Sequence, residues 1–173
     1  VFGVFSAIAT GSSNLTVDSC VFTGCLHEAI LSPCADPGNG GDTLWTIKRS
    51  LFYDNGYIPL DIECGTTGAN AKSGHNLHHK YLYNTFICGT LPPPITPHTG
   101  GGIYFRYRYA TGTVTISGIT IIGNVCIGDT SGAGYSNVEG IMAAEGDIHV
   151  TVDSFYNNAF DTLYASTGAF ILN

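Results

Sequence analysis

Two segments of the sequence decide the fold: Gly102-Ile-Tyr-Phe and, 38 residues later, Gly140-Ile-Met-Ala. Each opens with a small residue and continues as a short apolar stretch. A second apolar stretch follows each segment and ends at Asn124 or Asn158. Further copies of the opening segment begin at Gly3, Ala29, Pro59 and Gly168. The two kinds of stretch alternate strictly along the chain, which is the signature of an internal structural repeat.

The second stretch places a β-branched residue five positions before an aromatic or aliphatic one, with Asn or Cys three positions further on. Its copies are Val17…Phe22…Cys25, Ile47…Phe52…Asn55, Ile116…Ile121…Asn124 and Val150…Phe155…Asn158, with a degenerate copy at Leu77…Leu82…Thr85. One such unit cannot bury its apolar face, whereas stacked copies bury a continuous core. The sequence therefore predicts an all-β fold, a right-handed parallel β-helix solenoid of about five coils, with residues 1–173 in one domain.

An antiparallel sandwich or jelly roll also contains many short strands, but its hairpins do not require two strictly alternating patterns. In a parallel β-helix, asparagines at one fixed point of each coil are expected to form a ladder. Each side-chain amide would bond to the next coil at a tight bend. The predicted ladder residues are Asn55, Asn124 and Asn158.

Composition limits the partners. Charged residues make up 11% of the chain, the formal net charge is −7, and Lys and Arg together number six. Six basic residues are too few to contact the phosphates along a nucleic-acid backbone. No nucleic-acid partner is therefore expected. No apolar run approaches the roughly 18 residues that a membrane-spanning helix needs. No cofactor is expected.

The six cysteines include no CxxC pair, which favours disulfides and an oxidising compartment over a zinc site. The repeat places Cys34 and Cys64 at the same offset in adjacent coils, at a Cα separation that a disulfide tolerates. A ladder of free cysteines is the alternative. The repeat register suggests the pairs Cys34 with Cys64 and Cys88 with Cys126. Cys20 and Cys25 remain and could close on each other across one bend.

Asn14-Leu15-Thr16 is an N-glycosylation sequon, which makes Asn14 a glycosylation candidate if the source is eukaryotic. Together with the predicted disulfides, this motif favours an extracellular or cell-surface location.

Paired carboxylates are the first place to look for catalysis in this fold. Asp61 and Glu63 lie two residues apart on one expected strand, where they could act as acid and base on a glycosidic bond. A solvated outer face is the simpler interpretation, because Leu60 and Ile62 supply the inward positions. The register also sets Arg106 beside Glu63. No catalytic residue is assigned, and the chain is not expected to be an enzyme.

His75, His78 and His79 form the one histidine cluster of the sequence. His75 and His79 could share a metal ion if the segment were helical, whereas a strand would point His78 and His79 to opposite faces. A closed zinc site needs about four ligands, and none of the remaining ones stands at motif spacing. No metal is therefore expected.

Tyr104, Arg106 and Arg108 alternate with Phe105, Tyr107 and Tyr109, so one set faces the core and the other the surface. An exposed Tyr–Arg row is a candidate surface for a glycan or a neighbouring protein. Aromatic ladders stacked inside the coil are the simpler account of the many Tyr and Phe residues.

The rhythm Gly102-Ile103…Val114-Thr115-Ile116…Asn124 resembles the parallel β-helix repeats of polymorphic-membrane-protein-type adhesins and other large surface proteins of bacteria and protists. The resemblance covers most of the chain and specifies a fold rather than one protein. The third copy departs from it, with His78-His79 where β-branched residues are expected. The long loops 65–74 and 89–101 are further candidates for function.

Both ends of the sequence read as strands of the repeat rather than as polar caps. The chain is therefore expected to be a segment of a longer solenoid, or to self-associate end to end or with neighbouring β-helix segments. The predicted function is structural or adhesive, as a subunit or shaft segment of a filament or cell-surface appendage. The alternatives are a carbohydrate-active β-helix, such as a polysaccharide lyase, hydrolase or tailspike-like protein, and a glycan-binding module.

Overall fold

The computed structural model contains short β-strands and no helix among the residues that it describes, which are 4–5, 13–25, 28–34, 43–53, 55, 59–64, 75–87, 102–107, 114–127, 141–145, 148–160, 162–165 and 169–172. The strands are β1 (Val4–Phe5), β2 (Thr16–Asp18), β3 (Val21–Thr23), β4 (Ile30–Cys34), β5 (Thr46–Lys48), β6 (Leu51–Tyr53), β7 (Leu60–Cys64), β8 (His75–Leu82), β9 (Thr85–Ile87), β10 (Ile103–Tyr107), β11 (Val114–Ile122), β12 (Val125–Ile127), β13 (Ile141–Glu145), β14 (Ile148–Tyr156), β15 (Ala159–Phe160), β16 (Thr162–Ala165) and β17 (Ala169–Leu172). Within these residues, no helix is long and apolar enough to cross a membrane.

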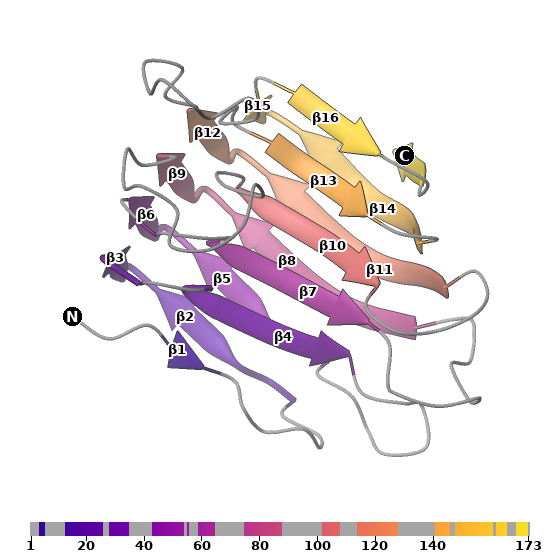
Figure 1. Ribbon diagram of the computed structural model, residues 1–173, viewed down its shortest axis with the longest axis horizontal. Helices are drawn as coiled ribbons and strands as arrows, with labels where there is room; N and C mark the ends of the chain where they lie inside the picture. The colour runs from indigo at the N-terminus through magenta and orange to yellow at the C-terminus, as the bar shows by residue number, and fades with distance from the viewer. Residues whose placement is uncertain are drawn as a thin grey trace.

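The strands form three parallel sheets (Figure 1). Sheet 1 has the order β1-β4-β7-β10-β13-β16, sheet 2 the order β17-β14-β11-β8-β5-β2, and sheet 3 the order β15-β12-β9-β6-β3. From β1 to β17 the chain visits the sheets in the constant order 1, 2, 3. We call each set of three consecutive strands a unit. The predicted all-β architecture with parallel pairing is confirmed, and the cyclic order is compatible with a β-helix.

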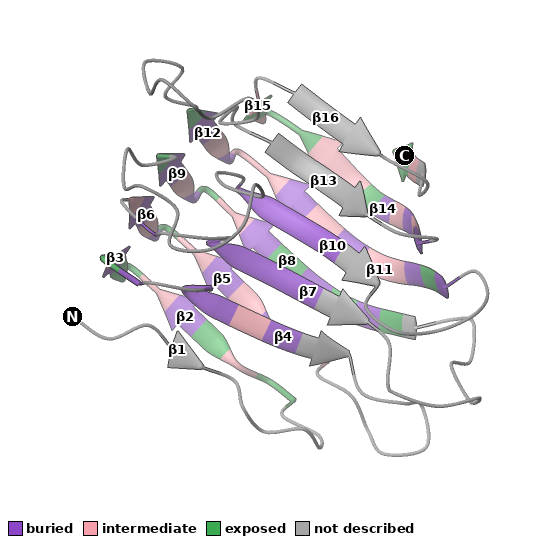
Figure 2. Cartoon of the chain, in the orientation of Figure 1, coloured by how far each residue is buried: buried purple, intermediate pink, exposed green. Residues whose placement is uncertain are grey.

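Inward side chains from all three sheets fill the core (Figure 2). Burial alternates along most strands, as expected where one face is packed and the other is not. Phe22 and Phe52 stack at a ring-centroid distance of 4.8 Å, and Phe52 and Phe86 stack at 4.9 Å. Cys126 continues this column in the next unit of sheet 3. The aromatic ladder expected inside the coil is therefore present.

Backbone bends with a positive φ recur at two points of the repeat and form two columns along the described units. The first column comprises Asn14, Leu44, His78 and Gly118, and the second comprises Ser19, Arg49, Tyr83, Gly123 and Asn157. A left-handed conformation costs about 1–2 kcal/mol for a residue with a side chain. The cost is offset in part at Asn14, Ser19, Leu44, Arg49 and Tyr83, whose N–H groups donate to the following unit. The Tyr83 N–H, for example, donates to the Ile122 carbonyl at 2.8 Å.

The predicted alignment of the second stretch is wrong between the first two units and the later ones. The stretch predicts that Phe52 aligns with Ile121, but Phe52 pairs with Phe86, and Ile121 pairs with Tyr81. A bend interrupts the alternation of inward and outward side chains once, so inward residues can stand five positions apart. In β2–β3 the interruption lies at Ser19, whereas in β11 it lies at Gly118. One spacing therefore describes two different bends.

Gly102 tests how tightly the units pack. A Cβ at this position would lie 2.6 Å from Cys126 Sγ and 3.2 Å from the Phe86 ring. We expect Gly102→Ala to lower the free energy of unfolding by about 1–3 kcal/mol, because overpacking forces neighbouring atoms to move. Chemical denaturation measures the change.

The double variant Gly102→Ala with Cys126→Ala provides the control. Removing the sulfur makes room for the new methyl group, so the double variant should be more stable than the sum of the two single effects predicts. If the stability changes of the two single variants simply add up in the double variant, this result would contradict the close approach of Gly102 to Cys126.

Candidate functional site

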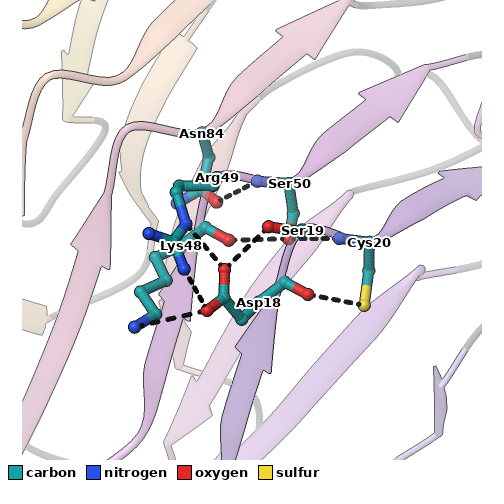
Figure 3. Close-up of polar contacts among 7 residues, drawn as sticks. All are labelled: Asp18, Ser19, Cys20, Lys48, Arg49, Ser50 and Asn84. Carbon is teal, nitrogen blue, oxygen red and sulfur yellow. Dashed lines mark hydrogen bonds and ion pairs between the residues drawn. The ribbon is translucent and has the colours of Figure 1, made fainter.

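A ladder of polar side chains links successive units at the bend between sheets 2 and 3. Asn84, Asn124 and Asn158 each follow a residue of the second positive-φ column. The Asn84 N–H donates to Asn124 Oδ1 at 3.0 Å, and the Asn124 N–H donates to Asn158 Oδ1 at 2.9 Å. The ladder continues downward through Ser50, whose N–H donates to Asn84 Oδ1 at 3.1 Å (Figure 3). It ends at Cys20, whose N–H donates to Ser50 Oγ at 3.2 Å.

Each asparagine of the ladder also donates through its amide to the preceding unit. Asn84 Nδ2 bonds the Ile47 carbonyl at 2.9 Å, and Asn124 Nδ2 bonds the Tyr81 carbonyl at 2.8 Å. Asn84 and Asn124 are almost fully buried. A buried amide is stabilised only when its donors and acceptors are satisfied, so each rung fixes the position of the unit below it.

The ladder differs from the predicted one in the second and third units. Asn124 and Asn158 are neighbours in it as predicted, but Asn55 is not a member. Asn55 lies after β6, where its Oδ1 accepts the Cys25 N–H and its Nδ2 donates to the Phe22 carbonyl, both at 3.2 Å. Asn84 was missed because the degenerate third copy was aligned on Thr85. Asn84, Asn124 and Asn158 share a sequence signal, a position immediately before a short strand of sheet 3.

The backbone register pairs Cys34 with Cys64 on neighbouring strands β4 and β7. This stacking was predicted, and a disulfide between the two residues stays a prediction. Cys126 is buried in the core, and its predicted partner Cys88 lies outside the described residues.

Cys20 and Cys25 do not form the suggested disulfide. Cys20 is an exposed thiol whose Sγ donates to the Asp18 carbonyl at 3.4 Å, whereas the Cys25 thiol is buried. Burial raises the pKa of the Cys25 thiol, which disfavours the reactive thiolate.

The outer face of sheet 1 differs from the prediction in its middle strands. Asp61 of β7 is fully buried, and its register neighbour Tyr104 of β10 is only 5% exposed. The predictions of a solvated Asp61 and an exposed Tyr104 are therefore wrong, because this part of the outer face is covered within the molecule. Alternation along one strand shows which side chains point away from the core, but not whether other parts of the chain cover them.

Three charged residues of sheet 1 align in the backbone register. The register pairs Arg106 of β10 with Glu63 of β7 on one side and with Glu145 of β13 on the other. The predicted neighbourhood of Glu63 and Arg106 is thus confirmed in the backbone register. Arg108 lies outside the described residues.

The histidines lie on a strand, β8, so the helical arrangement that would let His75 and His79 share a metal is not formed. His79 is buried and stacks on Trp45 at a centroid distance of 5.5 Å, with its Nδ1 2.8 Å from the Tyr81 hydroxyl oxygen. His78 is exposed on the other face. Among the described residues, no group of three His, Cys, Asp or Glu side chains could hold a metal ion.

An ion cluster that the sequence reading missed lies on the outer face of β2 and β5 (Figure 3). The Arg49 Nε donates to Asp18 Oδ1 at 2.8 Å, and Arg49 Nη2 contacts Oδ2. Lys48 Nζ lies 3.4 Å from the same Oδ2, and the Ser19 hydroxyl donates to Oδ1 at 2.9 Å. The Arg49 hydrogen bonds are the largest of the effects that lower the pKa of Asp18 to about 2.

The glycosylation candidate Asn14 is exposed, and so is Thr16 of the same sequon. Asn14 has a positive φ of 64°, and its backbone N–H donates to the Thr43 carbonyl at 3.1 Å. The backbone of the sequon is therefore held in place while its two acceptor-defining side chains face solvent.

Comparison with known proteins gives no matching family model, no matching curated protein and no matching solved structure. The functional interpretation therefore depends on the geometry of this chain.

Replacing Asn124 tests the ladder. We expect Asn124→Ala to lower the free energy of unfolding by at least about 1–3 kcal/mol, because the Asn84 N–H and the Tyr81 carbonyl lose their ladder partner. Urea denaturation measures the loss. Thr115→Ala, an exposed substitution on β11, is the control and should change stability by less than about 0.5 kcal/mol. Equal losses of stability in Asn124→Ala and Thr115→Ala would contradict a stabilising role of the ladder.

The Asp18 cluster predicts a pH dependence of stability. The folded-state pKa of about 2 lies below the ordinary value of 3.8, so ionised Asp18 stabilises the fold above pH 3.8. That contribution is lost as the pH falls from about 4 towards 2. The stability difference between the wild type and Asp18→Asn should therefore shrink over this range. Salt should also reduce it, since the cluster is partly exposed.

An NMR titration of the Asp18 carboxyl group provides the control for this prediction. Arg49→Ala should raise the pKa of Asp18 towards 3.8, because Arg49 is the largest cause of the shift. If the pKa of Asp18 is unchanged in Arg49→Ala, Arg49 is not the cause of the low pKa.

Proposed function

We propose that the chain forms a closed, right-handed parallel β-helix of about five coils and has a structural or adhesive function. In this proposal it is a subunit or shaft segment of an extracellular filament or cell-surface appendage. A glycan-binding or polysaccharide-degrading role is the alternative.

The ladder is the observation that supports this proposal most directly. The same polar contact recurs from Asn84 to Asn124 to Asn158, and it joins the third, fourth and fifth units in the same way. A contact that repeats with a constant step can be propagated without limit, which suits an elongated element. A catalytic site would instead require one unit to differ from its neighbours in an open cleft.

Two further observations support a durable element outside the cell. The chain carries few charges, and the in-register Cys34 and Cys64 would join neighbouring units covalently if they were oxidised.

The burial of Asp61 also argues against its use as an acid or base on a polysaccharide, because a substrate could not reach it in this structure.

Electron microscopy of the material as isolated, without denaturant, tests the proposed function. We expect regular filaments with an axial repeat of roughly 24 Å, which corresponds to about five coils at 4.8 Å each. A much longer repeat would indicate a slice of a larger protein or a different packing.

Discrete monomers under these conditions would contradict the filament. Polysaccharide turnover should then be measured with the wild type and with Asp61→Asn and Glu63→Gln. Turnover that these substitutions abolish would establish the carbohydrate-active alternative.

A further inference from the structure

Tyr83 belongs to the second column of positive-φ residues, where the backbone conformation does not suit a bulky side chain. Its φ is 57°, a value that is uncommon for residues other than glycine and strained for a large one. In the next two units the same bend is made by Gly123 and Asn157, the residue types that adopt a positive φ most readily. The bend alone therefore does not explain a tyrosine at this position.

The side chain of Tyr83 also adds little to the stability of the fold. Ser19 and Arg49, in the same column, hydrogen bond Asp18 through their side chains. Within the part of the chain that the structure describes, the Tyr83 side chain forms no such bond, and the residue is 60% exposed. A strained bend that carries an exposed aromatic side chain indicates a role other than stability.

The ring of Tyr83 is held in place by the glycine of the next unit. A Cβ at Gly123 would lie 2.6 Å from Tyr83 Cε1 and closer still to Cδ1, so one edge of the ring rests on the glycine backbone. The Tyr83 N–H donates to the Ile122 carbonyl at 2.8 Å, which fixes the base of the side chain. The ring is thus positioned before any ligand arrives, which reduces the entropy lost on binding.

The neighbours of Tyr83 along the stack of units define the chemistry of this surface. Tyr156 is 54% exposed, and Asn157 beside it is also exposed. Both lie two units beyond Tyr83, at roughly 10 Å along the stack. Arg49, one unit before Tyr83, is already paired with Asp18. The described surface around this column therefore offers two aromatic rings and an amide, and its one charged residue is engaged.

A neutral sugar matches this combination of groups. One face of a pyranose ring presents C–H groups, which pack on an aromatic ring, and its hydroxyl groups hydrogen bond an amide such as that of Asn157. A chain of linked sugar rings can reach from Tyr83 to Tyr156. A protein partner would need a much larger buried area than these few side chains provide.

We propose that Tyr83, with Tyr156 and Asn157, binds a neutral glycan chain along the bend between sheets 2 and 3. This inference rests on the adhesive part of the proposed function. It moves the glycan site away from Tyr104, which is only 5% exposed. The site is open, so a single chain should bind weakly, and copies aligned in a filament should bind the same polysaccharide more tightly through multivalency.

Binding of the full chain to immobilised neutral polysaccharides tests the proposal. The probes are hydroxyethyl cellulose, galactomannan and glycol chitin, and surface plasmon resonance measures binding whether the chain is monomeric or filamentous. We expect at least one of them to bind the wild type. Tyr83→Asn should weaken that binding by roughly tenfold, because a stacking contact is lost. Tyr83→Trp, which keeps an aromatic ring, should retain it.

The matched control is Leu44→Asn, which changes a residue of the first positive-φ column. Leu44 has a φ of 60° and is 47% exposed, so the substitution relieves a similar strain without removing an aromatic ring. It should bind as the wild type does. Both asparagine variants should unfold at the wild-type temperature or above it, since asparagine adopts a positive φ more readily.

Two results would overturn the proposal. One is a wild type that binds none of the three polysaccharides, and the other is binding that Tyr83→Asn leaves unchanged. The filament can fail separately: polysaccharide binding by discrete monomers would retain this site and reject the filament. Filaments that bind no polysaccharide would do the reverse.

Discussion

Everything in this structure depends on one constraint, which is that each unit must repeat the backbone path of the unit below it. Parallel pairing between equivalent strands limits changes of step to local irregularities, such as the register shifts of β11 against β8 and β14, because neighbouring strands of each sheet belong to successive units. The bends meet this constraint through columns of positive-φ residues whose N–H groups donate to the following unit. The asparagine ladder then fixes the bend between sheets 2 and 3 from inside.

The junction between the first two units shows how the constraint is met where the ladder has no asparagine. There the rung is the Ser50 hydroxyl, which accepts the Cys20 N–H. Asn55 joins the same two units at a different bend, and Asp18 with Arg49 joins them on the outer face. Three different contacts thus replace one repeated contact.

The sequence was sufficient for the all-β architecture with parallel sheets, because the repeat reports directly on strand stacking. The alternation of apolar residues predicted parallel strands, the pairing of Cys34 with Cys64 and the neighbourhood of Glu63 and Arg106. It was not sufficient for the bends, because a bulge at Gly118 and a turn at Ser19 give the same five-residue spacing. This ambiguity placed Asn55 in the wrong ladder and hid Asn84. The burial of Asp61 could not be predicted either, because strand periodicity does not report what covers an outer face.

The direction of the hydrogen bonds has a mechanical consequence. In all three sheets the interstrand bonds run from one unit to the next, so tension that separates the first and last strands loads every junction in series. Under such a load the bonds of a junction break together, and the junction with the weakest set of contacts opens first. The asparagine-free rung at Cys20 and Ser50 joins the first and second units, whereas Cys34 and Cys64 pair across the next junction, between the second and third units. A covalent link between Cys34 and Cys64 would therefore reinforce the junction that Ser50 and Asn84 already join, and it would leave the first junction to its non-covalent contacts.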